Sequence, residues 1–190
     1  MTTRSDRQLA AEQGDHEAQW HLGRQYRDGD MVPQDFTQAH RWIRMAADQG
    51  NAEAQNALAH LYQLGIGVEQ DFDRAFTWYQ KAADQAHPEA QCFFGFCYAN
   101  GWKVPKDLRQ ASTWYKSAAD QGNAEACMSL GFMFIANDGF MQDFPAAITW
   151  FTKAAERGDI EAESILIEIH REIEKAATIA STTFTYNSKG

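Results

Sequence analysis

A pattern that returns every 36 residues constrains the fold of this chain more than any other feature. Its clearest column is a tryptophan, found at Trp42, Trp78, Trp114 and Trp150. The residues that open successive copies keep the same spacing: Asp15, Asn51, His87, Asn123 and Asp159. A fixed period of this size is typical of a repeat protein, in which each unit buries its apolar face against its neighbours. The sequence therefore predicts a stack of similar units.

Each copy has the features of two helices joined by a short loop. In the second copy, Leu58, Leu61 and Tyr62 follow the spacing of one helical face. Asn51 precedes this helix, and its side-chain oxygen can accept a hydrogen bond from an amide of the first turn. Gly65 follows the helix and can take the left-handed conformation that ends a helix. These local signals predict the first helix of each repeat.

The second helix of each copy begins after an aspartate: Asp35, Asp71, Asp107 or Asp143. We interpret these aspartates as helix caps rather than catalytic carboxylates, because one stands directly before every second helix. The second helix carries the tryptophan column and an Ala-Ala pair, and it ends at Gly50, Gly122 and Gly158 but at Ala86 in the second repeat. The alanine pairs, with the small-residue column Gly23, Ala59, Gly95 and Gly131, predict a close approach of helices. The tryptophans are predicted to pack in the core between them.

A column of glutamates lies near the start of the first helices: Glu17, Glu53, Glu89, Glu125 and Glu161. Carboxylates in a first turn interact favourably with the helix dipole. The same residues could instead form an acidic row on an inner binding face. The sequence alone leaves both interpretations open.

The repeat resembles a known family. Its pattern, A-x-x-x-L-G-x-x-Y-x-x-G-x-G-V-x-x-D-x-x-x-A-x-x-W-Y-x-x-A-A-x-x-G, is similar to that of the Sel-one-like repeat, a relative of the tetratricopeptide repeat. The chain departs from the pattern at Ile43, Ala86 and Asn137. The resemblance implies an all-α fold, a right-handed α-α superhelix of helix-turn-helix repeats. For most of the family it implies an adaptor or scaffold that binds proteins. Some members are reported as hydrolases or antibiotic-binding proteins, but that branch has regularly paired cysteines, which this chain lacks.

We predict a single repeat domain over residues 1–190, because the period never breaks and no linker interrupts it. Its expected parts are a partial N-terminal cap at 1–14, four repeats at 15–50, 51–86, 87–122 and 123–158, a C-terminal capping helix at 159–180 and a tail at 181–190. In the tail, Phe184 and Tyr186 are predicted to pack on apolar surface of the same chain or of a second copy.

The net charge of −9 argues against a nucleic-acid partner, because a phosphate backbone calls for clustered lysine and arginine. No apolar run is long enough to cross a bilayer, so we expect no membrane insertion. The sequence has no signal peptide at its start, which predicts a cytoplasmic protein. An export signal trimmed from the chain would leave no trace in the sequence.

The residues that could carry chemistry are scattered. Cys92, Cys97 and Cys127 are an odd number at irregular positions, which indicates reduced cysteines rather than a disulfide framework or a zinc site. None of the six histidines pairs at ligand spacing with an acidic residue or a cysteine, and no phosphate-binding or nucleophile motif is present. We therefore predict no catalytic residue, no metal and no cofactor.

One face of the first helices is the predicted binding site. Counted from the opening residue of each repeat, positions 5, 9 and 12 point away from the core columns. In tetratricopeptide-like arrays this face lines the concave groove, so the resemblance implies the same here. The predicted groove residues are Trp20, Arg24, Arg27, His60, Gln63, Cys92, Phe96, Met128, Phe132 and Ile135. The rings of Phe96 and Phe132 are expected to lie side by side.

The second half of this predicted groove is apolar, which indicates either an interaction surface or a patch that the chain's own tail covers. We predict a non-catalytic scaffold that binds a protein or peptide there. A narrower alternative is a protein that neutralises a toxin or an enzyme through the same face. An alternative of another class is a hydrolase akin to the cysteine-rich branch; a Ser, Cys or His within hydrogen-bond distance of a carboxylate in a pocket would favour it.

Overall fold

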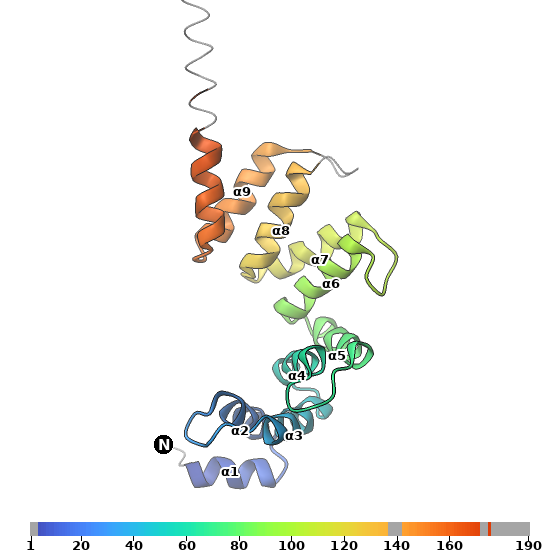
Figure 1. Cartoon of the computed structure of the whole chain (residues 1–190), viewed down its shortest axis with the longest axis vertical. Coiled ribbons are helices and arrows are strands. Elements are labelled where there is room, and N and C mark those ends of the chain that lie inside the picture. Colours follow the sequence, from blue (N-terminus) through green and yellow to red (C-terminus); the bar gives the residue numbers. More distant parts are fainter. Residues whose placement is uncertain (1–3, 137–141, 172–174, 176–190) are drawn as a thin grey trace, which may run out of the picture. The chain divides into compact units, whose positions relative to one another are not determined.

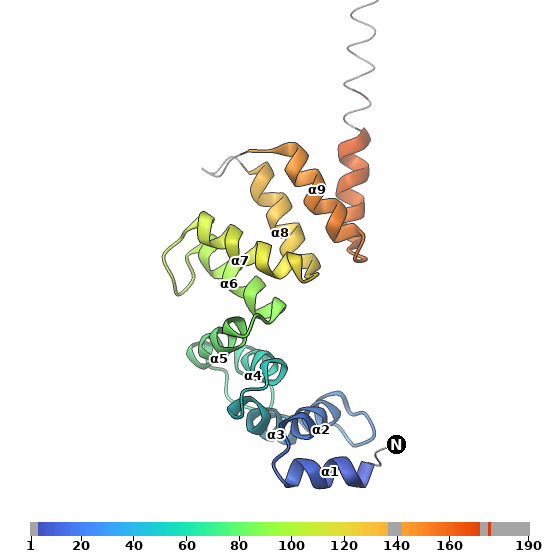
Figure 2. The ribbon, with the colours of Figure 1, turned by 180° about the vertical axis from the view of Figure 1, so that it is seen from behind.

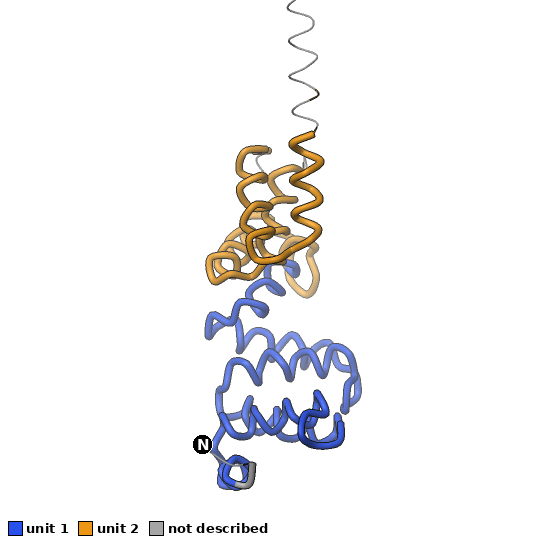
Figure 3. Tube along the Cα trace, turned by 90° about the vertical axis from the view of Figure 1, so that its left-hand side faces the viewer, with its two compact units in different colours: residues 1–97 blue, residues 98–190 orange. Residues whose placement is uncertain are grey.

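The computed structural model describes residues 4–136, 142–171 and 175, and every regular element in these ranges is a helix (Figure 1). The helices are α1 (Arg4–Glu12), α2 (His16–Asp28), α3 (Phe36–Asp48), α4 (Ala52–Leu64), α5 (Phe72–Asp84), α6 (Pro88–Asn100), α7 (Leu108–Asp120), α8 (Ala124–Ile135) and α9 (Phe144–Ala155). Residues 160–171 are also helical. The chain forms two compact units, residues 1–97 and 98–190, with the boundary inside α6 (Figure 3).

The first unit contains two complete helix pairs. Helix α2 packs against α3 and α4 against α5, while α3 also contacts α4, so that consecutive elements are neighbours in space (Figures 1 and 2). Helix α1 packs against α2 and has the place in the pattern of the end of a second helix. In the second unit, α7 contacts α8, α8 packs against α9, and residues 160–171 lie beside α9 (Figures 1 and 2). The predicted all-α fold of 36-residue helix pairs is confirmed.

The predicted helix caps are confirmed. Oδ1 of Asn51 accepts from the amide of Ala54 at 2.8 Å, and Oδ1 of Asp71 accepts from that of Arg74 at 2.9 Å. Equivalent bonds form at Asp15, Asp35, Asp107, Asn123, Asp143 and Asp159. First helices end at glycines in the left-handed region, with φ of 71° at Gly29 and 69° at Gly65. The local chemistry of the sequence thus determines where these helices begin and end.

The small-residue column does allow a close approach of helices. A Cβ atom on Gly23 would lie 2.6 Å from Cγ1 of Ile43, and one on Gly131 would lie 2.5 Å from Cε1 of Phe151. These contacts join the first and second helix of one repeat.

The tryptophan column is less uniform than predicted. Trp42 and Trp78 are buried, but Trp114 and Trp150 are only half-buried. The residue that follows each tryptophan is buried in every repeat: Ile43, Tyr79, Tyr115 and Phe151. Tryptophan keeps one side near the surface, where the Nζ atom of Lys81 lies 3.8 Å from the ring centroid of Trp78. The deepest layer of the second helices is therefore one residue further along the chain than the sequence analysis predicted.

Buried glutamines link the helices of the first unit. Nε2 of Gln55 donates to the carbonyl of Ala47 at 3.2 Å, and Oε1 of Gln55 accepts from Nε2 of Gln85 at 2.8 Å. Gln19 makes the equivalent bonds, to the carbonyl of Ala11 at 3.1 Å and from Gln49 at 2.7 Å. We call these bonds the glutamine ladder. Each first helix is thereby tied to the end of the second helix before it and to the end of the one after it.

His87 differs from the other opening residues. His87 is 5% exposed, and its Nε2 atom lies 3.2 Å from Oε2 of Glu53. Its Nδ1 atom lies 3.1 Å from Oε2 of Glu89, poorly aligned for a hydrogen bond but close enough for an ion pair.

No helix in the described part of the chain is long and apolar enough to cross a membrane. Three predictions fall on residues outside the described ranges. They concern the loop residue Asn137, the contacts of Phe184 and Tyr186, and the part of the capping helix that follows residue 171, of which only residue 175 is described. That the whole chain is one domain, and that it is cytoplasmic, stay predictions.

Candidate functional site

Among the predicted groove positions, position 9 is exposed in all four repeats. It is occupied by Arg24, His60, Phe96 and Phe132, and we call these residues the exposed column. In the first two repeats the exposed side chains are polar. Phe96 is 51% exposed and Phe132 is 47% exposed, although both are aromatic. Large apolar side chains are also in contact with water at the start of second helices, at Phe36, Phe72 and Phe144.

The other predicted groove residues are less accessible. Trp20, Cys92 and Met128, which share position 5, are buried. Arg27, Gln63 and Ile135, which share position 12, are half-buried. Position 9 lies opposite the core columns on the helix, whereas positions 5 and 12 lie on its flanks, where neighbouring helices can cover them. The accessible part of the predicted groove is therefore the exposed column.

Contacts with the second helix hold part of the exposed column in place. The ring of His60 stands edge-on to that of Tyr79, with centroids 5.5 Å apart. The ring of Phe132 stands edge-on to that of Phe151 at 5.3 Å. Because Tyr79 and Phe151 are buried, these side chains rest on the core with one side open to solvent. Phe96 belongs to the first unit and Phe132 to the second, and the side-by-side placement of their rings stays a prediction.

The glutamate column is linked to the opening residues of the following repeats. Oε1 of Glu17 accepts from Nδ2 of Asn51 at 2.8 Å, and Glu53 contacts His87 as described above. Because these contacts join one repeat to the next, they support a structural role for Glu17 and Glu53.

Three of the titratable groups with shifted pKa values are buried or partly buried: Cys97, Cys127 and His40. Burial raises the pKa of the Cys97 thiol to about 12, and burial also raises that of Cys127. All three cysteines are reduced and buried, including Cys92, which the sequence analysis predicted on the groove face. Burial lowers the pKa of His40, and the nearby guanidinium groups of Arg44 and Arg74 lower it further. Within the described ranges, no three His, Cys, Asp or Glu side chains are grouped as metal ligands.

Comparison with solved structures finds related folds. A Sel1 repeat protein from Oxalobacter formigenes is 28% identical, with a TM-score of 0.75, and the match covers 85% of this chain and 73% of that one. A protective antigen present in uropathogenic Escherichia coli strains, which displays an SLR fold, is 36% identical with a TM-score of 0.76, over 85% of this chain and 35% of that one. The chain thus spans about a third of the antigen's length.

A more distant likeness is to an immunity protein from Pseudomonas aeruginosa, which is 21% identical with a TM-score of 0.60, over 83% of this chain and 57% of that one. At this identity the likeness shows the fold alone. A comparison with curated proteins gave no match.

The sequence profile of the Sel1 repeat matches four consecutive segments of the chain, 16–51, 52–87, 88–123 and 124–159. Their boundaries lie one residue from those predicted by the 36-residue pattern, and together they cover most of the sequence. Sel1 repeat proteins generally mediate protein–protein interactions and are generally non-catalytic. On its repeats, its helix pairs and its structural relatives, this chain belongs to the Sel1 repeat family.

Proposed function

We propose that this protein is a non-catalytic scaffold that binds a protein or peptide on the exposed faces of its first helices. The observation that carries the proposal is the exposure of Phe96 and Phe132 at the same position of two repeats. About half of each ring is in contact with water, and that half contributes little to folding. Its burial under a partner would contribute roughly 0.8–1.5 kcal/mol, half of the value for a fully exposed side chain.

The exposed column has a polar part and an aromatic part, and we expect the partner to have a matching polar part and apolar part. In the first unit, Arg24 and His60 favour a polar or acidic segment, with the guanidinium group of Arg24 5.7 Å from the ring centroid of Trp20. Phe96 and Phe132 favour apolar side chains. Buried aromatic anchors typically supply most of the energy of an interface, surrounded by near-neutral contacts.

Non-catalytic function is supported by the state of the cysteines. The thiolate is the nucleophilic form of cysteine, and a pKa raised to about 12 keeps the thiol of Cys97 protonated. The hydrolase alternative would need a nucleophile other than Cys97. The neutralising alternative shares the proposed surface and differs only in the partner, so the identity of the captured protein distinguishes it from a general scaffold.

The test is affinity capture from the native cell with the wild type and the variants Phe96→Ala and Phe132→Ala, followed by titration of the captured partner. Each variant should weaken binding at least tenfold, because a truncated anchor typically loses about 2 kcal/mol or more. The free energy of unfolding should fall by no more than about 1 kcal/mol, the size of one edge-on ring contact.

Phe144→Ala is the matched control, because Phe144 is 54% exposed but lies on a second helix. This variant should bind as the wild type does. Variants of Phe96 and Phe132 that unfold easily yet bind normally would show that both rings are ordinary packing residues, and the proposal would fail.

A further inference from the structure

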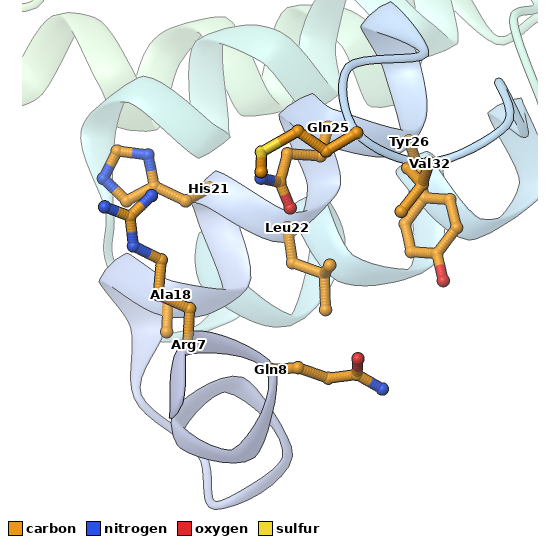
Figure 4. A pocket seen from close by; sticks show the side chains of 9 residues that line it. Arg7, Gln8, Ala18, His21, Leu22, Gln25, Tyr26 and Val32 are labelled. Carbon is orange, nitrogen blue, oxygen red and sulfur yellow. The ribbon is translucent and has the colours of Figure 1, made fainter. Parts of the chain in front are cut away.

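A hollow between α1, α2 and the loop after α2 is outside the exposed faces considered so far. Its volume is about 180 Å³, and a neighbouring hollow of about 130 Å³ shares Arg7, His21 and Gln25 with it. The inner wall is apolar, with Leu22 and Val32 both buried. Figure 4 shows the side chains of Arg7 and His21 close together at one side of this hollow, with Leu22 deeper between the helices. The cavity therefore combines an apolar wall with a polar mouth.

The polar residues of the mouth replace apolar ones of the repeat pattern. Arg7, His21 and Gln25 stand 36 residues before Ile43, Ala57 and Leu61, all of which are buried. The next repeat thus uses the same three positions for packing. A polar and cationic surface at this place is poorly suited to receive another such repeat, because a charge is costly to bury without a partner. The residues of the mouth instead suit a polar ligand.

The charges at the mouth favour an anion. Arg7 and Arg24 line it, in a chain whose net charge is −9. Among the described residues, the side chains of Arg7 and His21 form no hydrogen bond or ion pair. Asp28 also lines the mouth, but the guanidinium group of Arg27 binds it at 2.7 and 3.1 Å, and this contact lowers the pKa of Asp28.

Asp30 is the other carboxylate at the mouth. The mouth is thus lined by the guanidinium groups of Arg7 and Arg24 and the imidazole of His21, together with two carboxylates. Of these carboxylates, Asp28 is already paired with Arg27.

The size of the hollow limits the apolar part of the ligand. Pockets that hold drug-sized molecules are typically about 300–1,000 Å³, so 180 Å³ suits a single apolar side chain rather than a long hydrocarbon chain. A guanidinium group binds a carboxylate through paired, charge-assisted hydrogen bonds. Capture of a terminal carboxylate is one of the recurring ways in which proteins recognise peptides.

We propose that this cavity binds the C-terminal residue of a peptide or protein that ends in an apolar side chain. The terminal carboxylate lies between Arg7 and Arg24, and the side chain packs on Leu22 and Val32. A free apolar amino acid shares this chemistry, with its ammonium group near Asp30. The site shares Arg24 with the exposed column, but it does not include Phe96 or Phe132, whose exposure carries the proposed scaffold function, so the two proposals can fail separately.

Titration calorimetry of the whole chain tests the proposal with a flexible six-residue peptide of glycine and serine that ends in leucine. The comparison ligands are the same peptide with a C-terminal amide, the same peptide ending in serine, and free leucine. We expect the leucine peptide with a free carboxylate to bind at least tenfold more tightly than the amide and than the serine peptide. Binding of free leucine but not of the peptide would support the carboxylate site and identify the free amino acid as its ligand.

Arg7→Gln removes one charge from an exposed side chain of the mouth and should weaken binding of the leucine peptide at least tenfold. Arg109→Gln, an exposed arginine on α7, is the matched control and should leave binding unchanged. The proposal is overturned if the amide binds as well as the acid, if Arg7→Gln binds normally, if both arginine variants lose binding equally, or if no ligand binds at millimolar concentration. Loss of partner binding in Phe96→Ala would not affect any of these results.

Discussion

At the scale of the residue, the carboxylate of Asp71 shows how one side chain sets the start of a helix. Its Oδ1 atom accepts from the amides of Asp73 at 3.0 Å and Arg74 at 2.9 Å, so two first-turn donors that lack helical partners are satisfied. Such bonds span only two or three residues. The sequence could therefore predict them without knowledge of the fold, and the same holds for the glycines that end the first helices.

Asp71→Ala should lower the free energy of unfolding by about 1 kcal/mol, because it removes the cap of α5. Glu69→Ala, two residues earlier in the exposed loop, is the control and should change stability by less than about 0.5 kcal/mol. Urea unfolding of the two variants measures the difference. If Asp71→Ala left stability unchanged but abolished partner binding, the aspartate column would have a role in recognition and the capping interpretation would be wrong.

Ala86 has φ of 62°, in the left-handed region, at the position where other second helices end at glycine. Ala86→Gly should stabilise the protein by roughly 0.5–1 kcal/mol. The left-handed conformation costs a non-glycine residue about 1–2 kcal/mol, which outweighs the added entropy of the unfolded chain, about 0.4–1 kcal/mol.

Gly50→Ala is the reverse experiment, because Gly50 has φ of 93° and a Cβ there would meet no atom within 4 Å. Any loss of stability in this variant reports the backbone alone, and we expect it to melt at a lower temperature than the wild type. Thermal melts in which both variants shift in the same direction would contradict the argument.

At the scale of the element, helical periodicity predicted much of the exposed face but not all of it. Position 9 lies opposite the core and is exposed in every repeat, at Arg24, His60, Phe96 and Phe132. Trp20, Cys92 and Met128 were predicted on the same face but are buried. Exposure on the flank of a helix depends on how closely its neighbours pack, which the sequence of one helix does not specify.

The glutamine ladder was missed for a related reason. Gln19, Gln55 and Gln91 keep the 36-residue spacing and all are buried. Glutamine is usually found at protein surfaces, so its presence on a helix suggests an exposed position. The spacing itself was the available signal. A polar residue type that recurs in register, together with a second one at 49, 85 and 121, indicates paired buried amides.

Trp78→Ala should cost roughly 3–5 kcal/mol, because removing a buried ring leaves a cavity in the second repeat. Trp150→Ala removes the same side chain from a half-buried site and should cost clearly less. Equilibrium unfolding in urea compares them. Equal losses would show that burial of the ring does not determine its contribution.

At the scale of the whole molecule, the unbroken 36-residue period predicts one cooperative array, whereas the contacts divide the chain into two compact units. In repeat proteins, stability is approximately a sum of the terms of single repeats and of neighbouring pairs. A destabilising substitution in one unit therefore tests whether the stability of the other unit also falls. This coupling decides whether the chain unfolds as a single domain, as the sequence predicts.

Gly131→Ala would place a Cβ atom 2.5 Å from the ring of Phe151, so this buried ring or the helix that carries it must shift and the second unit should lose about 1–3 kcal/mol. If the chain is one cooperative array, the backbone amides of α4 and α5 should also exchange with solvent faster than in the wild type. Hydrogen exchange measured by mass spectrometry reads both units at once. Faster exchange confined to α8 and α9 would show two independently unfolding domains.

The glutamine ladder also bears on how such a chain can change length. Gln55 reaches back to the carbonyl of Ala47 and receives a bond from Gln85, so its partners lie in the two flanking second helices. A deletion of a few residues inside a helix would rotate a glutamine side chain away from its hydrogen-bond partner in the neighbouring helix. The buried amide groups would then be left unpaired. Removal of a whole copy, for example joining Gly50 to His87, would present Gln91 with the same carbonyl that Gln55 now binds. Gene duplications and losses in steps of one complete repeat are therefore the length changes that this interior accepts.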